Sequence, residues 1–246
     1  MSLTKPKKFV MAGSFADLVK LSAAVQGRIA TRFDEPLGAD AEAMGIFLNT
    51  LSTLFPEGEQ LFCESVRHYR EKLRASDPTF AGSALDKDIG WFIGHEAHHT
   101  NAHIGLNEEL YLRGYKNVDK LLKKSLKAVL KSPLLAIHAT SVLEHYTATM
   151  ARLILDHPDI RSLLGTAELD LWDYHAVDEW NHRSVSHSVL MLVDKHRGYM
   201  MVPVSAVFFA VVAALYIKNG GRWNTFLARK LIELTPTILE YFNSDY

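Results

Sequence analysis

Residues Tyr174–Ser186 read YHAVDEWNHRSVS and contain His175, Glu179 and His182 at spacings of four and then three residues. At about 100° per residue, positions i, i+4 and i+7 fall on one stripe of a helix. Two imidazoles and a carboxylate that point the same way from one rigid helix suit a transition metal such as zinc or iron. The stretch therefore predicts part of a metal site.

A second stretch, FIGHEAHHTNAH, carries Glu96 and His99, which repeat the Glu-x-x-His spacing of Glu179 and His182. In ferritin-like dimetal proteins, two helices each provide a Glu-x-x-His pair and two others each provide a single Glu. The two pairs therefore predict a site for two metal ions inside a helical bundle. Iron is the expected metal, and manganese and zinc are the alternatives.

A single glutamate on the helix before each pair completes this pattern, and helical phase selects it. Glu59 shares an apolar stripe with Phe62 and is expected to point inward, whereas Glu64 falls about 140° away on a polar face. Glu144 lies on a face of small and apolar residues, where a buried carboxylate is costly unless a metal compensates it. The alternative for Glu144 is a buried salt bridge to Arg152.

Further histidines lie close to these ligand candidates. His175 is expected as an additional ligand, one helical turn before Glu179. His103 follows His99 at i+4, so it is either another ligand or a partner that holds a carboxylate in place. Three other histidines lie off the stripes and are expected to be exposed or simply hydrogen-bonded: His98, His145 and His187.

Helical periodicity dominates from Ala39 onward, and no stretch shows the alternation of a β-strand. The predicted fold is all-α: a ferritin-like four-helix bundle at about 56–197 with additional N-terminal and C-terminal helices, in one domain over 1–246. Proline and glycine positions set the expected helix ends. The expected helices cover residues 15–29, 41–54, 56–75, 81–111, 117–131, 133–156, 167–196, 199–217 and 222–242.

The apolar helix at about 199–218 differs from the others, because residues 199–217 carry no charge. Its length reaches the lower limit for a membrane span. Pro203, Ser205 and four alanines suit close packing, so the helix is expected to be buried beside the bundle. Peripheral membrane contact through 199–217 is the alternative. A homodimer formed through exposed helix faces is also expected.

Composition limits the partners and the location of the protein. A net charge of −1 gives no electrostatic basis for binding nucleic acid. The single cysteine, Cys63, excludes an intrachain disulfide and suits a reducing compartment. The first residues lack the apolar run of a secretory signal, so a cytoplasmic location, with or without membrane association, is expected.

Four segments together resemble a bacterial family described as predicted metal-dependent hydrolases: NTLSTLFPEGEQLF, FIGHEAHHTNAHIGLNEEL, SVLEHYTA and YHAVDEWNHRSVS. The resemblance covers roughly residues 48–200 and implies a ferritin-like dimetal protein, and its Phe-Pro-x-Gly-Glu element supports Glu59. The family more often has Gln at the position of His95, so His95 is not expected as a ligand. The spacing of 175–182 also resembles the di-iron N-oxygenases that oxidise arylamines, in which the additional histidine is a ligand.

Three functions compete on this basis. The first is a di-iron oxidase or oxygenase that activates O₂ on a small, hydrophobic substrate. The second is a metal-dependent hydrolase, in which a metal lowers the pKa of bound water and presents hydroxide to an ester, amide or phosphate. His95-Glu96-x-x-His99 also matches the zinc-protease motif, but that interpretation leaves Glu59, Glu144 and the 175–182 triplet without a role. The third is metal binding or storage.

Overall fold

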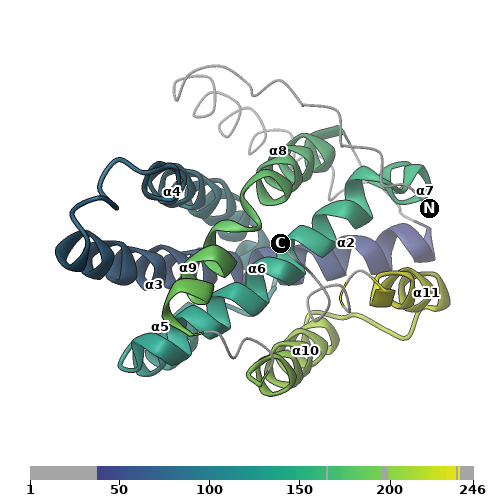
Figure 1. The fold of residues 1–246 in the computed structure, drawn as a ribbon. Helices are drawn as coiled ribbons and strands as arrows, with labels where there is room; N and C mark the ends of the chain where they lie inside the picture. Colours follow the sequence, from purple (N-terminus) through teal and green to yellow (C-terminus); the bar gives the residue numbers. More distant parts are fainter. Residues whose placement is uncertain (1–37, 165, 195–198, 237, 239–246) are drawn as a thin grey trace.

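The computed structural model describes residues 38–164, 166–194, 199–236 and 238, with only the backbone of 166–170; the helix expected at 15–29 lies outside these ranges. Within this part of the chain every regular element is a helix (Figure 1), which confirms the all-α prediction. The helices are α2 (Ala39–Ser52), α3 (Phe55–Ser76), α4 (Ala84–Leu112), α5 (Asp119–Val129), α6 (Pro133–Leu155), α7 (Pro158–Arg161), α8 (Thr166–His182), α9 (Val185–Val193), α10 (Met201–Lys218) and α11 (Thr225–Glu233).

Four helices form a closed bundle. Helix α3 packs along α4, and α6 packs along α8; α3 also packs on α6, and α4 on α8. Helix α2 contacts α3 and α4, while α10 contacts α6 and α2 outside the bundle (Figure 1). The four helices that carry the candidate ligands are therefore the four that surround a common interior.

The beginnings of the bundle helices follow from local sequence. Pro56 lies in the first turn of α3, where its missing N–H leaves no helical hydrogen bond unmade. The Ser83 hydroxyl accepts a hydrogen bond from the backbone N–H of Asp86 and caps α4. Ser132 caps α6 in the same way, directly before Pro133. These residues fix where each of the three helices begins.

Two apolar clusters lie on either side of the candidate ligands. One contains Phe62 of α3, Phe92 of α4 and Ile137 of α6, which follow or precede the glutamates of their helices by a few residues. The other uses the opposite ends of the helices, including Phe55 of α3 and Trp172 of α8. The level of the glutamates is therefore enclosed by apolar packing at both ends of the bundle.

The helix expected at 167–196 is divided into α8 and α9, with a break at Arg183 and Ser184, so this prediction was wrong. The Arg183 guanidinium donates a hydrogen bond to the backbone carbonyl of Trp180 and stacks over its ring, with the Arg183 Cζ atom 3.9 Å from the ring centroid. In a continuous helix that carbonyl would accept the N–H of Ser184. The competing contact ends α8 directly after His182.

Helix α10 is the main correction to the expected packing. Only 17% of its residues are buried, although it was expected to be buried beside the bundle. It is the one helix among the described residues whose length and composition would allow it to cross a membrane. The final helix, expected over 222–242, is interrupted after Glu233, because Pro236 cannot donate a helical hydrogen bond to the carbonyl of Ile232. Leu234 forms a turn, and residues 235, 236 and 238 are helical again.

Candidate metal centre

The four glutamates selected by spacing and phase all lie inside the bundle. Glu59 of α3, Glu96 of α4, Glu144 of α6 and Glu179 of α8 are each at most 1% exposed. Glu64, five residues after Glu59, is half-buried and accepts a hydrogen bond from Gln60. The structure therefore places Glu59 on the inward face, as its helical phase predicts.

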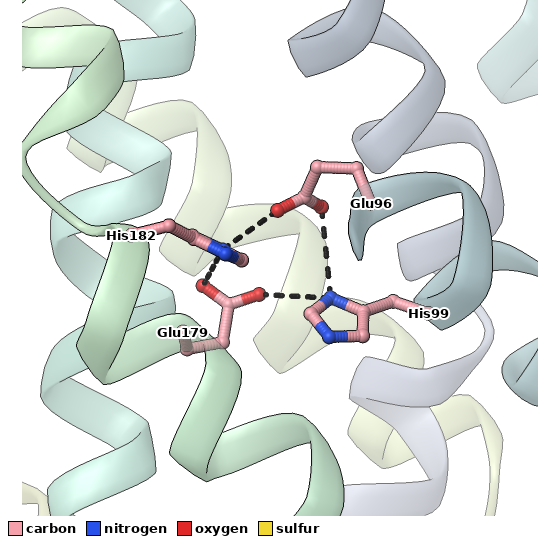
Figure 2. Close-up of side chains that lie close together, drawn as sticks. All are labelled: Glu96, His99, Glu179 and His182. Atoms are coloured by element: carbon pink, nitrogen blue, oxygen red, sulfur yellow. Dashed lines mark ion pairs between the residues drawn. The ribbon is translucent and has the colours of Figure 1, made fainter. Parts of the chain in front are cut away.

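The two Glu-x-x-His pairs face each other across the bundle (Figure 2). Nε2 of His182 lies 2.8 Å from Oε1 of Glu96, and Nδ1 of His99 lies 3.5 Å from Oε1 of Glu179. Within each pair the imidazole and carboxylate are 3.8 Å apart. Two carboxylates and two imidazoles therefore alternate around a small ring, one pair from α4 and one from α8.

Two buried groups of side chains could hold a metal ion. The first consists of Glu96, His99, Glu179 and His182, and the second of Glu59, His103 and His175; within each group one ligand atom per residue lies within 4.8 Å of the others. Glu144 belongs to neither group, although its Oε2 atom lies 3.9 Å from Nε2 of His182. All eight residues named in the sequence analysis thus meet in one region.

The donor atoms of this region fit a cation better than they fit one another. Both carboxylate oxygens of Glu144, Oε1 of Glu59 and Nδ1 of His182 are buried without a hydrogen-bond partner. The oxygens of Glu96 face only the imidazoles of His99 and His182. Buried polar atoms normally have a partner, because their desolvation is otherwise uncompensated. Divalent cations accept carboxylate and imidazole donors of this kind, so the residues present fit metal ions.

Among the described residues, no lysine or arginine forms an ion pair with these glutamates. Arg152, the alternative partner of Glu144, instead pairs with Asp156, with Nε 2.9 Å from Oδ2. The alternative prediction, a buried salt bridge between Glu144 and an arginine, is therefore wrong.

The four buried glutamates divide into two pairs by the direction of their pKa shift. Burial raises the pKa of Glu59 and of Glu144 well above the usual value. The neighbouring carboxylate, which is Glu96 for Glu59 and Glu179 for Glu144, adds to this effect. Burial also opposes ionisation of Glu96 and Glu179, but ion pairs with histidines outweigh it, and the pKa of each is lowered. The surroundings therefore oppose ionisation of Glu59 and Glu144 and favour ionisation of Glu96 and Glu179.

The histidines divide in the same way. Burial lowers the pKa of His99, but contacts with Asp178, Glu179 and Glu96 outweigh it and hold the pKa well above its usual value. The pKa of His182 rises to about 9 for the same reason, with Glu96 as the main partner. A metal ion that binds these two imidazoles at neutral pH must therefore displace protons.

Asp178 is a functional candidate that the sequence analysis did not identify. It is buried, and its Oδ2 atom lies 3.3 Å from Nε2 of His99 and 3.1 Å from Nδ1 of His95. A carboxylate on one ring nitrogen of a histidine leaves the other nitrogen, here Nδ1 of His99, oriented toward a metal. His95 contacts this carboxylate and lies outside both groups, as its departure from the family pattern suggested.

Two hydroxyls hold the carboxylates from outside. Thr100 donates a hydrogen bond to Oε2 of Glu59 over 2.9 Å, and Thr147 donates one to Oε2 of Glu179. Each leaves the other oxygen of its carboxylate directed to the interior. Single hydroxyls on neighbouring helices give no sequence signal of this role, because threonine is common on any helix face.

A directed chain of hydrogen bonds reaches His175. The Asn107 amide donates to the backbone carbonyl of Ser52 over 2.9 Å, so its Oδ1 atom accepts from the Ser52 hydroxyl over 2.7 Å. Having used its hydrogen there, the hydroxyl accepts from Nδ1 of His103 at 2.8 Å. Burial and His175 keep the pKa of His103 well below its usual value, so Nε2 of this neutral ring accepts from Nδ1 of His175 at 2.6 Å.

The chain leaves the Nε2 lone pair of His175 aimed at Oε1 of Glu179, 2.8 Å away. Burial and His99 lower the pKa of His175, although the contact with Glu179 acts in the opposite direction. A neutral ring that carries its proton on Nδ1 would place two acceptors face to face here. Two ligands that bind one ion at about 2.1 Å and at right angles lie roughly 3 Å apart. Nε2 of His175 and Oε1 of Glu179 thus have the spacing of two donors that could share one ion, while His103 is hydrogen-bonded to His175.

The remaining histidines named in the sequence analysis lie outside both groups. His145 and His187 are buried and hydrogen-bonded, the first to the backbone carbonyl of Ile238 and the second to the Ser141 hydroxyl. His98 is half-buried on α4. Their angular positions on the helices thus correctly distinguished these histidines from the candidate ligands.

The fold and the site define an all-α protein with two buried histidine and glutamate groups that could bind metal ions. The chain belongs to the family described as predicted metal-dependent hydrolase, which matches residues 33–246. In comparisons with curated proteins and with solved structures, nothing matched this chain. The family description supports the hydrolase expectation and gives no support to oxidation; the ferritin-like and arylamine N-oxygenase resemblances stay predictions.

Proposed function

We propose that this chain is a metal-dependent hydrolase with two divalent ions between α3, α4, α6 and α8. The observation that carries the proposal is the convergence of four buried glutamates whose oxygens largely lack hydrogen-bond partners. Four carboxylates balance the charge of two divalent cations, so a loaded centre can stay neutral in the apolar interior. The family description supports hydrolysis as the reaction.

The proposed ligands follow the pairing of the helices, which divides them differently from the two groups of neighbouring donor atoms described above. Glu59, Glu96 and His99 lie on α3 and α4, and the matching set of Glu144, Glu179 and His182 lies on α6 and α8. His175 joins the second set through its Nε2 atom. Bound divalent ions would supply Lewis acidity and lower the pKa of a bound water.

The chain's own groups have defined tasks in this proposal. Asp178 orients His99, while Thr100 and Thr147 fix the rotation of Glu59 and Glu179. His103 keeps the proton of His175 on Nδ1 and leaves Nε2 free to bind. Ligands held in this way need little rearrangement when they bind.

Tyr174 is the group we assign to the substrate. Its hydroxyl is buried without a hydrogen-bond partner, and its ring packs edge-on against His99 with 5.5 Å between centroids. Burial raises its pKa to about 12, so the hydroxyl is a neutral donor at physiological pH. A donor at this place suits a carbonyl or phosphoryl oxygen that gains negative charge during hydrolysis.

The test is metal analysis of protein purified without chelators, combined with assays on model esters, amides and phosphate esters. We expect about two divalent ions per chain and hydrolysis that a chelator abolishes and added metal restores. Tyr174→Phe should keep the metal content and lower kcat. Bound metal without hydrolysis would contradict the proposed reaction. Bound metal in a protein that catalyses no reaction at all would favour metal storage.

Di-iron oxidation is the second candidate, and the placement of the ligands favours it. One glutamate on each of two helices and a Glu-x-x-His pair on each of two others is the arrangement of ferritin-like di-iron and di-manganese proteins. O₂ consumption by the iron-loaded protein, without hydrolysis of any model substrate, would favour this candidate. Zinc-supported hydrolysis without O₂ uptake would exclude it.

A further inference from the structure

A cavity of about 710 Å³ lies between α2, α6, α10 and α11, apart from the candidate metal centre. Helix α6 lines it with Tyr146, Thr149 and Met150, whereas Glu144 points into the bundle. Residues that are two positions apart on a helix differ in direction by about 200°, so Tyr146 and Glu144 occupy opposite faces of α6. The cavity is therefore a separate feature of the fold. Two of the helices that line it, α10 and α11, lie outside the four-helix bundle (Figure 1).

The wall of the cavity is apolar and aromatic. Phe47 and Leu51 of α2, Phe208 and Val212 of α10, and Leu227 of α11 contribute to it. Cavities of about 300–1,000 Å³ with such walls are the usual size for small-molecule sites. A polar ligand would leave its hydrogen-bonding groups unpaired against this wall, so an apolar chain suits it better.

The opening of the cavity combines apolar side chains with one cation. Phe209, Ile217 and Trp223 line the cavity and are also 46%, 69% and 84% exposed. Arg222 lines it at the same place, is exposed, and forms no ion pair with any of the described residues. The Tyr216 hydroxyl donates a hydrogen bond to the Arg222 carbonyl over 2.9 Å and holds this segment against the end of α10.

One acid is hydrogen-bonded to a residue that lines the cavity. Asp40 accepts a hydrogen bond from the side chain of Asn224, which also lines the cavity, over 2.9 Å. Among the described residues the Arg222 guanidinium has no carboxylate partner, so it offers a charged group at the end of an otherwise apolar space. Guanidinium groups bind carboxylates through two parallel hydrogen bonds.

From these observations we propose that the cavity binds a long-chain carboxylic acid, with the chain among α2, α6, α10 and α11 and the carboxylate at Arg222. The apolar wall accounts for the chain, and the unpaired cation at the opening accounts for the acidic head group. This ligand site is independent of the metal centre, so binding does not require a metal.

The test is a fluorescence titration of the full chain with cis-parinaric acid. We expect saturable binding of one probe per chain and displacement by oleate. Ala228→Trp fills the cavity from α11 and should weaken binding by at least about tenfold. The control is Ala128→Trp on the exposed face of α5, which should bind as the unmodified chain does. Absence of saturable binding, or equal binding by Ala228→Trp with unchanged melting temperature, would overturn the proposal.

The contact between the carboxylate and Arg222 is tested by a surface substitution, which does not threaten folding. Arg222→Gln should weaken oleate binding by about tenfold and leave oleyl alcohol unchanged, because only the acid gains from the guanidinium. Arg229→Gln, an exposed position of α11 that does not line the cavity, is the matched control. If the acid and the alcohol lose affinity equally in Arg222→Gln, the assignment of the carboxylate is wrong.

Discussion

The metal centre and helix α10 depart from the ordinary distribution of polar and apolar side chains in opposite directions. The bundle buries four glutamates almost completely, while α10 exposes most of an apolar helix whose one charged residue is Lys218 at its end. A buried charge and an exposed apolar face are both unfavourable unless something compensates them. The difference teaches that the two regions need different partners: cations for the bundle and an apolar surface for α10.

The largest expected effect comes from Glu179→Ala. Glu179 lies within 4 Å of three imidazoles, those of His99, His175 and His182. Its removal should abolish binding of both ions and hydrolysis with it, as measured by metal analysis and activity assay. Glu64→Ala, a half-exposed glutamate of α3, should change neither.

The same variant separates the bundle from the zinc-protease interpretation. That interpretation builds the site from His95, Glu96 and His99 alone, so it predicts that one zinc ion stays bound in Glu179→Ala. Retained zinc with retained activity would contradict the proposed dimetal centre.

The second effect is the dependence of metal binding on pH. His182 has a pKa of about 9 without metal, and the pKa values of Glu59 and Glu144 are also raised. A cation must displace these protons, so affinity should rise with pH by about tenfold per unit for each proton released. Isothermal titration in buffers of different ionisation enthalpy counts the protons; binding without proton release would contradict the assignment of these ligands.

Stability of the metal-free protein should follow the opposite trend. The pKa of His182 is raised above the value of about 6.5 in the unfolded chain, so the folded state binds its proton more tightly. This contribution to stability is complete below about pH 6.5 and is lost as the pH rises through about 9. Thermal unfolding of metal-free protein at pH 6.5 and pH 9.5 measures it; a higher melting temperature at pH 9.5 would count against these shifts.

The third effect concerns the hydrogen-bond chain that ends at His175. Ser52→Ala removes the hydroxyl that accepts from His103, and His103→Leu removes the next member of the chain. Each should weaken metal binding by about 10–100-fold without abolishing it, as for other partners of metal ligands. Competition with a fluorescent chelator measures the change.

Ser65→Ala is the matched control for this chain. It also removes a buried hydroxyl, which bonds Thr140 at a different level of the bundle. Metal affinity that falls equally in Ser65→Ala and Ser52→Ala would show a general effect of packing rather than orientation of His175.

The smallest effect on folding is expected on α10, where Val207 is 66% exposed. Val207→Lys should change the free energy of unfolding by no more than about 0.5 kcal/mol, whereas Val66→Lys in the core should prevent folding. We propose a bilayer surface as the partner of this face, because Lys218 and Arg222 at its end suit anionic head groups. Sedimentation with anionic phospholipid vesicles should therefore decrease in Val207→Lys.

Two other outcomes would change this assignment. If Val207→Lys abolishes a dimer detected by light scattering instead of vesicle binding, a second copy of the chain covers α10. Unfolding of Val207→Lys would show that the helix is buried by the chain itself.

The four glutamates could be predicted because spacing and phase are local properties of a helix. Glu59 and Glu64 differ by their angle around α3, and that angle separated the buried residue from the half-exposed one, in agreement with the Phe-Pro-x-Gly-Glu element. The all-α fold followed for the same reason. Metal binding by these residues stays a prediction of the sequence and the structure together.

What the sequence did not predict depends on contacts between distant segments. Asp178 acquires its role only because α4 brings His95 and His99 to it, and Ser52 meets His103 across 51 positions of the chain. The exposure of α10 could not be predicted either, because an apolar helix has the same sequence pattern in a core and on a surface. The break after His182 depends on one arginine side chain that folds back on Trp180.

The direction of the hydrogen-bond chain is set by one main-chain group, the carbonyl of Ser52, which determines how the Asn107 amide is turned. Ser52 belongs to α2, which precedes the bundle and supplies none of the candidate ligands. A truncated protein that begins at α3 would keep all seven candidate ligands but would lose the group that selects the tautomer of His175. Any minimal version of this centre must therefore include α2.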